Sequence, residues 1–143
     1  MKYILTFVFL SFTTFIFAQK VASYSCGEPS TAEYEAFSFW VKGSARAEIT
    51  YTYGKNWKEV TVLYTGKSVF NGEQCFKVKF TNGYELMIIP QGLNLKVVDS
   101  EGQYNKLFKW HYEGPINGIG TFCEPCAEDE NESILLINEY FMR

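Results

Sequence analysis

Two cysteines near the C-terminus are the residues whose type and spacing could most readily do chemistry. Cys123 and Cys126 lie close together in the segment GTFCEPCAEDE, residues 120–130. Thiols at this spacing can exchange disulfides, ligate a metal ion or form a short covalent cross-link. The chain contains four cysteines, and the other two are Cys26 and Cys75.

The order Cys-x-Pro-Cys, followed by a segment expected to be helical, resembles the active-site motif of the thioredoxin family. This resemblance implies a thiol–disulfide oxidoreductase in which Cys123 and Cys126 exchange electrons with a substrate. Thioredoxin-like folds continue through most of their domain after the motif, whereas little of the sequence follows Cys126. Glu124 and the carboxylates after Cys126 also disfavour a thiolate. We therefore treat redox catalysis as the alternative to a structural role.

The first 18 residues have the layout of a secretory signal peptide. Lys2 supplies a positive charge, residues 4–17 are uncharged and mostly apolar, and Ala18 is a small residue at a plausible cleavage position. The apolar run is shorter than the ~20 residues that a membrane-spanning helix needs. We expect cleavage after Ala18, with Ala22 as the alternative, and export to the periplasm or the cell exterior. We expect no integral membrane segment in the mature chain.

An oxidising destination favours disulfides over metal thiolates. A zinc site made by all four cysteines would also need a second close pair, and Cys26 and Cys75 are isolated. We predict no metal and no other cofactor, and we favour two structural disulfides. Four cysteines allow three pairings, and we weigh Cys26–Cys75 with Cys123–Cys126 evenly against the two crossed pairings combined.

Composition and charge limit the possible partners. The formal net charge is −3, and no cluster of lysine or arginine is present, which argues against nucleic acid as a partner. His111 is the single histidine, and no nucleophile near it in the sequence suggests triad chemistry. We nominate no catalytic residue, and the partner is an unknown ligand or protein.

Apolar and polar residues alternate with period two through the middle of the chain, which is typical of half-buried β-strands. The alternating runs cover residues 49–53, 60–64, 76–80, 86–88, 93–97 and 108–112. Asn82-Gly83 separates two of these runs and is a strong hairpin signal, because both residues tolerate positive φ. The connections are too short for crossover helices, so we predict mostly antiparallel strands.

Two further segments have a less regular pattern. Residues 34–42 fit a strand slightly better than a helix, and both interpretations remain open. Residues 126–141 predict a helix, because acidic residues suit its N-terminal end and its apolar residues share one face. The residues of that face are Ile134, Ile137, Phe141 and Met142.

These elements predict one mainly β domain over residues 34–143, preceded by a polar lead-in at residues 19–33. We expect an antiparallel meander of about six to seven strands, arranged as a small barrel or sandwich, with the C-terminal helix packed on it.

A non-catalytic binding or interaction module is the function that this fold favours, and an enzyme is the less favoured class. Small barrels commonly bind ligands on one sheet face or in the barrel mouth. Aromatic faces suit sugars, peptides or apolar ligands. The candidate ligand contacts are Trp40, Trp57, Trp110 and Tyr112. The alternative is the thiol–disulfide oxidoreductase implied by Cys123 and Cys126.

Overall fold

The computed structural model describes residues 19–111 and 125–143. Residues 1–18, which we expect to be a signal peptide, and residues 112–124 lie outside the described part of the chain. The predictions that concern these two segments therefore remain predictions.

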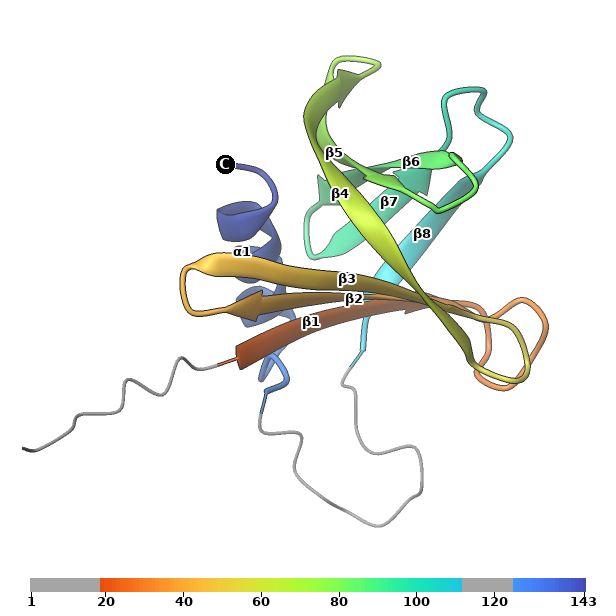
Figure 1. Ribbon diagram of the computed structural model, residues 1–143, viewed down its shortest axis with the longest axis horizontal. Coiled ribbons are helices and arrows are strands. Elements are labelled where there is room, and N and C mark those ends of the chain that lie inside the picture. Colours follow the sequence, from red (N-terminus) through yellow and green to blue (C-terminus); the bar gives the residue numbers. More distant parts are fainter. Residues whose placement is uncertain (1–18, 112–124) are drawn as a thin grey trace, which may run out of the picture.

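The described residues form eight strands and one helix (Figure 1). The elements are β1 (Gln19–Cys26), β2 (Glu35–Lys42), β3 (Ala45–Tyr53), β4 (Lys58–Phe70), β5 (Glu73–Lys79), β6 (Glu85–Gln91), β7 (Asn94–Val98), β8 (Asn105–Trp110) and α1 (Glu130–Tyr140). Each strand pairs antiparallel with the next, and β8 pairs with β1, so the sheet closes into a barrel. The mainly β antiparallel fold is confirmed, and the segment 34–42, for which strand and helix were both open, contains the strand β2.

The strand count exceeds the prediction because residues 19–26 form β1 and are not a polar lead-in. Tyr24 is fully buried on the inner face of the barrel wall. Val21 and Ser23 alternate with it and are also buried. Val21 exchanges backbone hydrogen bonds of 2.7 and 2.8 Å with the segment 125–127. A distant segment covers this strand, so the small and polar residues of β1 gave no simple alternating signal.

The predicted register of β5 is confirmed. Phe76 is fully buried inside the barrel, whereas Lys79 is exposed. The turn at Asn82-Gly83 also forms, since the Gly83 amide donates a 2.9 Å hydrogen bond to the Phe80 carbonyl. Gly83 has φ +88°, a value that glycine adopts readily.

β4 changes its pairing partner halfway along its length. Residues 58–62 pair with β3, and residues 63–70 pair with β5. The register shifts between Tyr64 and Gly66, and Gly66 has φ +122°. A shift of this kind bends a strand and strengthens its local twist. Among the described residues, the first half of β4 therefore has a strand neighbour on one side, β3.

Aromatic and aliphatic side chains fill the inside of the barrel. An eight-stranded barrel is just wide enough for side chains, or for one small ligand. Here the ring of Phe39 lies with its centroid 5.8 Å from that of Phe76 and 5.3 Å from that of Phe141. The largest side chains that are fully buried include Tyr24, Phe37, Phe39, Phe76, Phe108 and Phe141. A ligand must therefore bind at an end of the barrel or outside it.

The helix begins at Glu130, four residues later than the predicted start at 126. Asp129 is the N-cap residue, and its side chain accepts a 2.8 Å hydrogen bond from the backbone amide of Glu132. The preceding segment 125–127 pairs with β1, so it is not available to the helix. The predicted apolar face is confirmed by the burial of Ile134, Ile137 and Phe141, with Met142 half-buried.

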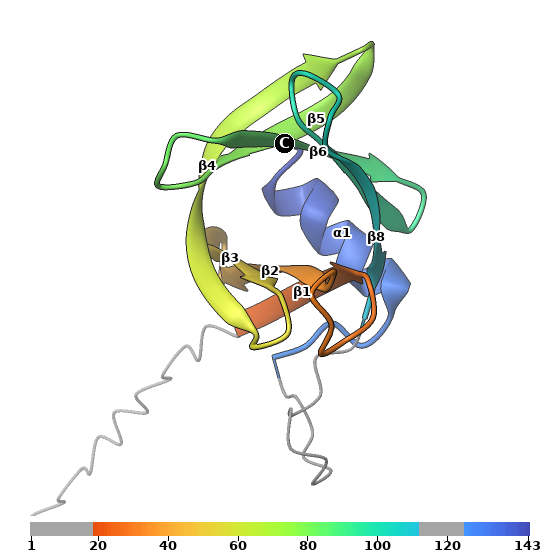
Figure 2. The ribbon, with the colours of Figure 1, turned by 90° about the vertical axis from the view of Figure 1, so that its right-hand side faces the viewer.

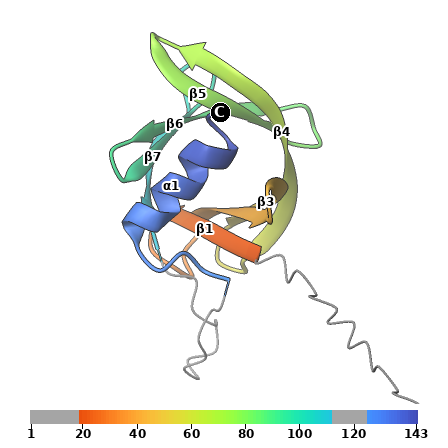
Figure 3. The ribbon, with the colours of Figure 1, turned by 90° about the vertical axis from the view of Figure 1, so that its left-hand side faces the viewer.

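α1 lies across one end of the barrel and closes it (Figures 2 and 3). The hydroxyl of Tyr64 donates a 3.2 Å hydrogen bond to the Phe141 carbonyl. Arg46 donates a 2.9 Å bond to the Tyr140 carbonyl, and the Tyr140 hydroxyl donates a 2.9 Å bond to the Gly43 carbonyl. The guanidinium of Arg46 thus supplies a positive charge where the helix ends, which favours the helix dipole. The helix that we predicted to pack on the sheet is an end plug.

Candidate functional site

The barrel end opposite α1, called the mouth below, is surrounded by four connections between strands. They span residues 27–34, 54–57, 80–84 and 99–104. Figure 2 looks toward this end, with α1 behind it, and Figure 3 looks toward the end that α1 covers. The mouth is therefore the end at which the barrel wall and its loops remain accessible.

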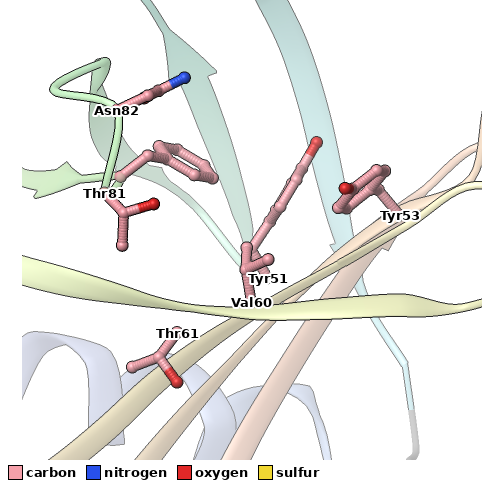
Figure 4. Close-up of a pocket in the computed structure, with 7 residues that line it drawn as sticks. Tyr51, Tyr53, Val60, Thr61, Thr81 and Asn82 are labelled. Atoms are coloured by element: carbon pink, nitrogen blue, oxygen red, sulfur yellow. The ribbon is translucent and has the colours of Figure 1, made fainter.

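A pocket of about 360 Å³ lies at the mouth, and we call it the mouth pocket (Figure 4). It separates the hairpin of β3 and β4 from the turn that joins β5 to β6. Its lining residues are Tyr51, Tyr53, Val60, Thr61, Phe80, Thr81 and Asn82.

The mouth pocket lies beside the first half of β4, which pairs with β3 and not with β5. Residues 58–62 pair with β3, and pairing with β5 starts only at Leu63 and Lys79. Beyond Lys79 the chain pairs with itself in the turn, where the Phe80 amide donates a 2.8 Å hydrogen bond to the Tyr84 carbonyl. The wall is thus open between the first half of β4 and this turn.

Three aromatic rings form the apolar part of the mouth pocket. The rings of Tyr51 and Tyr53 are stacked, with centroids 5.6 Å apart and an interplanar angle of 21°. Phe80 meets Tyr51 edge to face at 5.2 Å. Tyr53 is 38 % exposed, so part of its ring is accessible to a ligand. Stacked and edge-to-face contacts of this kind stabilise the three rings and leave a flat apolar surface at the pocket.

A polar cluster lies behind Tyr51, centred on the carboxylate of Glu35. This side chain is nearly buried and accepts hydrogen bonds from two phenols and one ammonium group. Tyr51 donates at 2.7 Å to Oε2, Tyr104 donates to the same oxygen, and Lys106 donates to Oε1. The carboxylate is therefore paired in both charge and hydrogen bonding, as a buried carboxylate must be.

Burial and the Glu35 charge raise the pKa values of the neighbouring acidic groups. Desolvation is the larger cause for Tyr51 and Tyr104, and the hydrogen bond to Glu35 adds to it. Desolvation, followed by Glu35, also raises the pKa of the Cys26 thiol to about 11, although Lys106 acts in the opposite direction. Near neutral pH the phenols and the thiol are therefore protonated and serve as neutral hydrogen-bonding groups.

A second contact holds the turn on the far side of the mouth pocket. The Tyr84 hydroxyl donates a 3.2 Å hydrogen bond to Oδ2 of the buried Asp99. Desolvation and then Asp99 raise the pKa of Tyr84. The backbone amide of Tyr84 also donates a 3.0 Å bond to Oδ1 of Asn82. These bonds fix the turn relative to the β7–β8 connection.

The aromatic residues predicted to bind a ligand do not come together. Trp40 is half-exposed on β2, on the side of the wall opposite Phe39. Trp57 lies at the mouth and packs on Tyr34, with ring centroids 4.7 Å apart. Trp110 packs against the main core. Tyr112 lies outside the described residues, and none of the three described tryptophans lines the mouth pocket.

The predicted Cys26–Cys75 disulfide is wrong, because both residues are free thiols. Cys26 packs against the inner core, whereas Cys75 belongs to a small cluster with Met87 and Ile89 on the outer face of the sheet. The barrel wall separates the two thiols, so Cys26 and Cys75 cannot bind the same metal ion. In the part of the chain that the structure describes, no group of three or more metal-ligating side chains occurs.

Cys126 is buried beside β1, and its predicted partner Cys123 lies outside the described residues. The Cys123–Cys126 disulfide therefore stays a prediction.

Sequence reasoning missed the Glu35 cluster, although a signal was present. Glu35 has the same period-two phase as Phe37 and Phe39, and Lys106 has the same phase as Phe108. A charged residue in phase with the apolar inner face needs a buried partner. The sequence alone does not show that β2 and β8 bring these two charges together.

Comparisons with known proteins return no matching family model, no matching curated protein and no matching solved structure. No helix within residues 19–111 and 125–143 is both long enough and apolar enough to cross a membrane.

Proposed function

We propose that this protein is an exported, non-catalytic binding module whose ligand site is the mouth pocket. One observation carries the proposal: the barrel wall opens at the mouth pocket, whereas side chains fill the interior and α1 closes the other end. An opening lined by aromatic rings and a few polar side chains is the usual form of a small-ligand site.

The chemistry around the mouth pocket supports binding over catalysis. The carboxylate behind Tyr51, that of Glu35, is paired with Lys106 and two phenols. Cys26 keeps its proton near neutral pH, because burial raises its pKa to about 11. Glu35, Tyr104 and Lys106 are bonded in one cluster that holds Tyr51 in place, so the arrangement suits a rigid support for a ligand site.

Export and a Cys123–Cys126 disulfide complete the proposal. Lys2, the apolar run and Ala18 support removal of residues 1–18. The burial of Cys126 beside β1 supports a structural role for this cysteine over disulfide exchange with a substrate. Intact-mass measurement of the exported protein should give a chain that starts at Gln19 or a few residues later, and recovery of the full-length chain would contradict export.

A ligand screen with a blocked pocket tests the proposed site. Thr81 is an exposed turn residue that lines the mouth pocket, so Thr81→Trp should fill the pocket with little effect on folding. Leu93 lies in the turn between β6 and β7, at the other end of the barrel, and Leu93→Trp is the matched control. The library contains neutral sugars, short capped peptides and small apolar aromatic compounds, and ligand-observed NMR detects binding.

The proposal expects at least one compound to bind the wild-type and Leu93→Trp proteins alike and to lose about tenfold or more in affinity on Thr81→Trp, a difference of about 1.4 kcal/mol. Compounds that bind all three proteins equally would place the site elsewhere. Reduction of insulin by the wild-type protein, abolished in a Cys123→Ser, Cys126→Ser variant, would replace the proposal with redox catalysis.

A further inference from the structure

We infer that the mouth pocket recognises a neutral, hydroxyl-rich ligand, namely one or two sugar units of a glycan. This inference rests on the proposed function, because it names the ligand class for the same pocket. Three properties of the lining residues carry it: their neutrality, their exposed aromatic surface, and side chains that can both donate and accept hydrogen bonds.

Neutrality is the first property. None of the seven lining residues carries a formal charge near neutral pH. The carboxylate behind Tyr51, that of Glu35, is already paired with Lys106. The exposed carboxylate of Glu48 contacts Thr61 on the face of the β3–β4 hairpin opposite Tyr51. A charged ligand in this pocket would lose hydration without gaining an opposite charge, which is costly. The pocket therefore favours an uncharged ligand.

The aromatic surface is the second property. Tyr53 is stacked on Tyr51 and is 38 % exposed, so its ring presents one edge of a flat apolar surface at the mouth. Phe80 supports Tyr51 from the other side, with ring centroids 5.2 Å apart. Pyranose rings carry C–H groups on their faces that pack against aromatic rings. Because the tyrosine rings are held by each other and by Glu35, little conformational entropy is lost when a ligand packs on them.

The polar side chains are the third property. Thr81 has a hydroxyl group and Asn82 has an amide, and each can donate as well as accept. Thr61 adds little to this set, because its hydroxyl donates a 2.9 Å bond to Glu48 and its side chain lies on the other side of β4 from Tyr51 (Figure 4). Oδ1 of Asn82 accepts from the Tyr84 amide, which leaves the NH₂ group of Asn82 as a donor. Hydroxyl groups of a sugar donate and accept at the same time, so they match this mixture.

The position of the turn between β5 and β6 favours a compact ligand over an extended peptide. In Figure 4, Thr81 and Asn82 lie on the turn, across the pocket from Tyr51 and Val60 on the hairpin. The turn therefore stands beside the first half of β4, where an added peptide strand would have to run. A purely apolar ligand would fit the rings but would bury the polar side chains without partners, at about 1–3 kcal/mol for each.

A sugar panel tests the ligand class on the full mature protein. The probes are methyl glycosides and disaccharides of glucose, galactose, mannose, xylose and N-acetylglucosamine. Glucuronic acid and glucosamine are the charged comparisons, and a capped tripeptide with a central phenylalanine and indole represent the other classes. Binding is measured by ligand-observed NMR and by calorimetry on the wild-type protein and on Thr81→Trp.

One matched pair of variants and one single variant sharpen the result. Tyr53→Ala removes the exposed ring and should weaken sugar binding by about threefold to tenfold, whereas Tyr53→Phe keeps the ring and should stay within about twofold. Thr81→Val keeps the shape of the side chain without its hydroxyl and should also weaken binding. The inference expects neutral sugars to bind, to lose binding on Thr81→Trp, and to bind better than their charged counterparts.

Different failures have different meanings. If the peptide or indole binds in a manner sensitive to Thr81→Trp while no sugar does, the sugar inference is overturned and the mouth pocket remains the binding site. If sugars bind equally to the wild-type protein and Thr81→Trp, both the inference and the proposed site are wrong. Tighter binding of glucuronic acid or glucosamine than of glucose would contradict the argument from neutrality.

Discussion

The hydroxyl of Tyr51 donates a 2.7 Å hydrogen bond to Oε2 of Glu35, while the ring of the same tyrosine lines the mouth pocket. One side chain thus connects the pocket to the polar cluster inside the barrel. The cluster fixes the ring at one end, and stacking on Tyr53 fixes its face. The pocket is therefore built on a wall that is already held in place before a ligand arrives.

Replacing Glu35 should destabilise the protein. Glu35→Gln removes the charge that pairs with Lys106 and places an NH₂ group among three donors, so at least one of these donors loses its acceptor. We expect a loss of about 2 kcal/mol in the free energy of unfolding, measured by urea denaturation. Glu59→Gln changes an exposed glutamate on β4 and should stay within about 0.5 kcal/mol. Equal stability of the two variants would show that the cluster contributes nothing.

The Cys26 thiol should make stability fall at alkaline pH. Its pKa is raised from 9.0 to about 11 in the folded protein, so the folded state holds this proton more tightly than the unfolded chain does. Between these two pH values the unfolded chain binds fewer protons, and the free energy of unfolding decreases as the pH rises. Urea denaturation at pH 8, 9, 10 and 11 measures the slope, where ~10 is near the middle of the window.

In Cys26→Ser the thiol's part of this slope should disappear, and the remaining decrease should come from other groups such as Tyr51 and Tyr104, whose pKa values are also raised. A variant whose slope matches the wild-type slope would refute the role of Cys26.

Counting thiols tests the corrected cysteine assignment. Cys75 is fully buried and Cys26 is half-buried, and burial raises the pKa of both thiols. Native protein should therefore react slowly with a thiol reagent at pH 7.5, since the thiolate is the reactive form (its pKa in an exposed cysteine is ~8.5). In urea without reductant, two thiols per chain should react rapidly. A count of four would exclude the Cys123–Cys126 disulfide, and a count of zero would show that Cys26 and Cys75 are also in disulfides, which contradicts their assignment as free thiols.

The end plug should depend on one aromatic side chain. Phe141 is fully buried, and its ring contacts those of Phe39, Tyr64 and Phe76 with centroids 5.3 to 5.8 Å apart. Phe141→Ala should cost about 3–5 kcal/mol, through lost burial and the cavity left behind. Leu135→Ala on the same helix is the control, because Leu135 is 64 % exposed and should change stability by less than about 0.5 kcal/mol. A small effect of Phe141→Ala would mean that the barrel is stable without its plug.

Local sequence pattern was sufficient for much of the barrel. The phase of Phe76 and Lys79 gave the register of β5, and Asn82-Gly83 gave the turn, because both depend on neighbours in sequence. β1 was missed for the opposite reason: Val21 and Ser23 are buried by contacts that include the segment 125–127, from the far end of the chain. Because residues on both faces of β1 are buried, its sequence does not alternate between apolar and polar residues.

The candidate site was less predictable because it depends on where strands separate. Tyr51 and Tyr53 were correctly read as one face of a strand, but their exposure follows from the change of partner in β4 at Leu63. No short sequence pattern specifies where β4 exchanges one partner for the other, because that depends on strands that are distant in the sequence. The tryptophans were nominated by residue type alone, and the fold places them on different surfaces.

Chemical-shift mapping tests the central claim, that the ligand site is the mouth pocket, most directly. The ¹⁵N-labelled mature protein is titrated with the strongest binder from the ligand screen, and each backbone amide is followed by NMR. The account predicts that the largest shifts fall on residues 51–53, 58–61 and 80–84, with α1 unaffected. Shifts concentrated on α1 or on the outer face around Trp40, with the mouth residues unchanged, would contradict it.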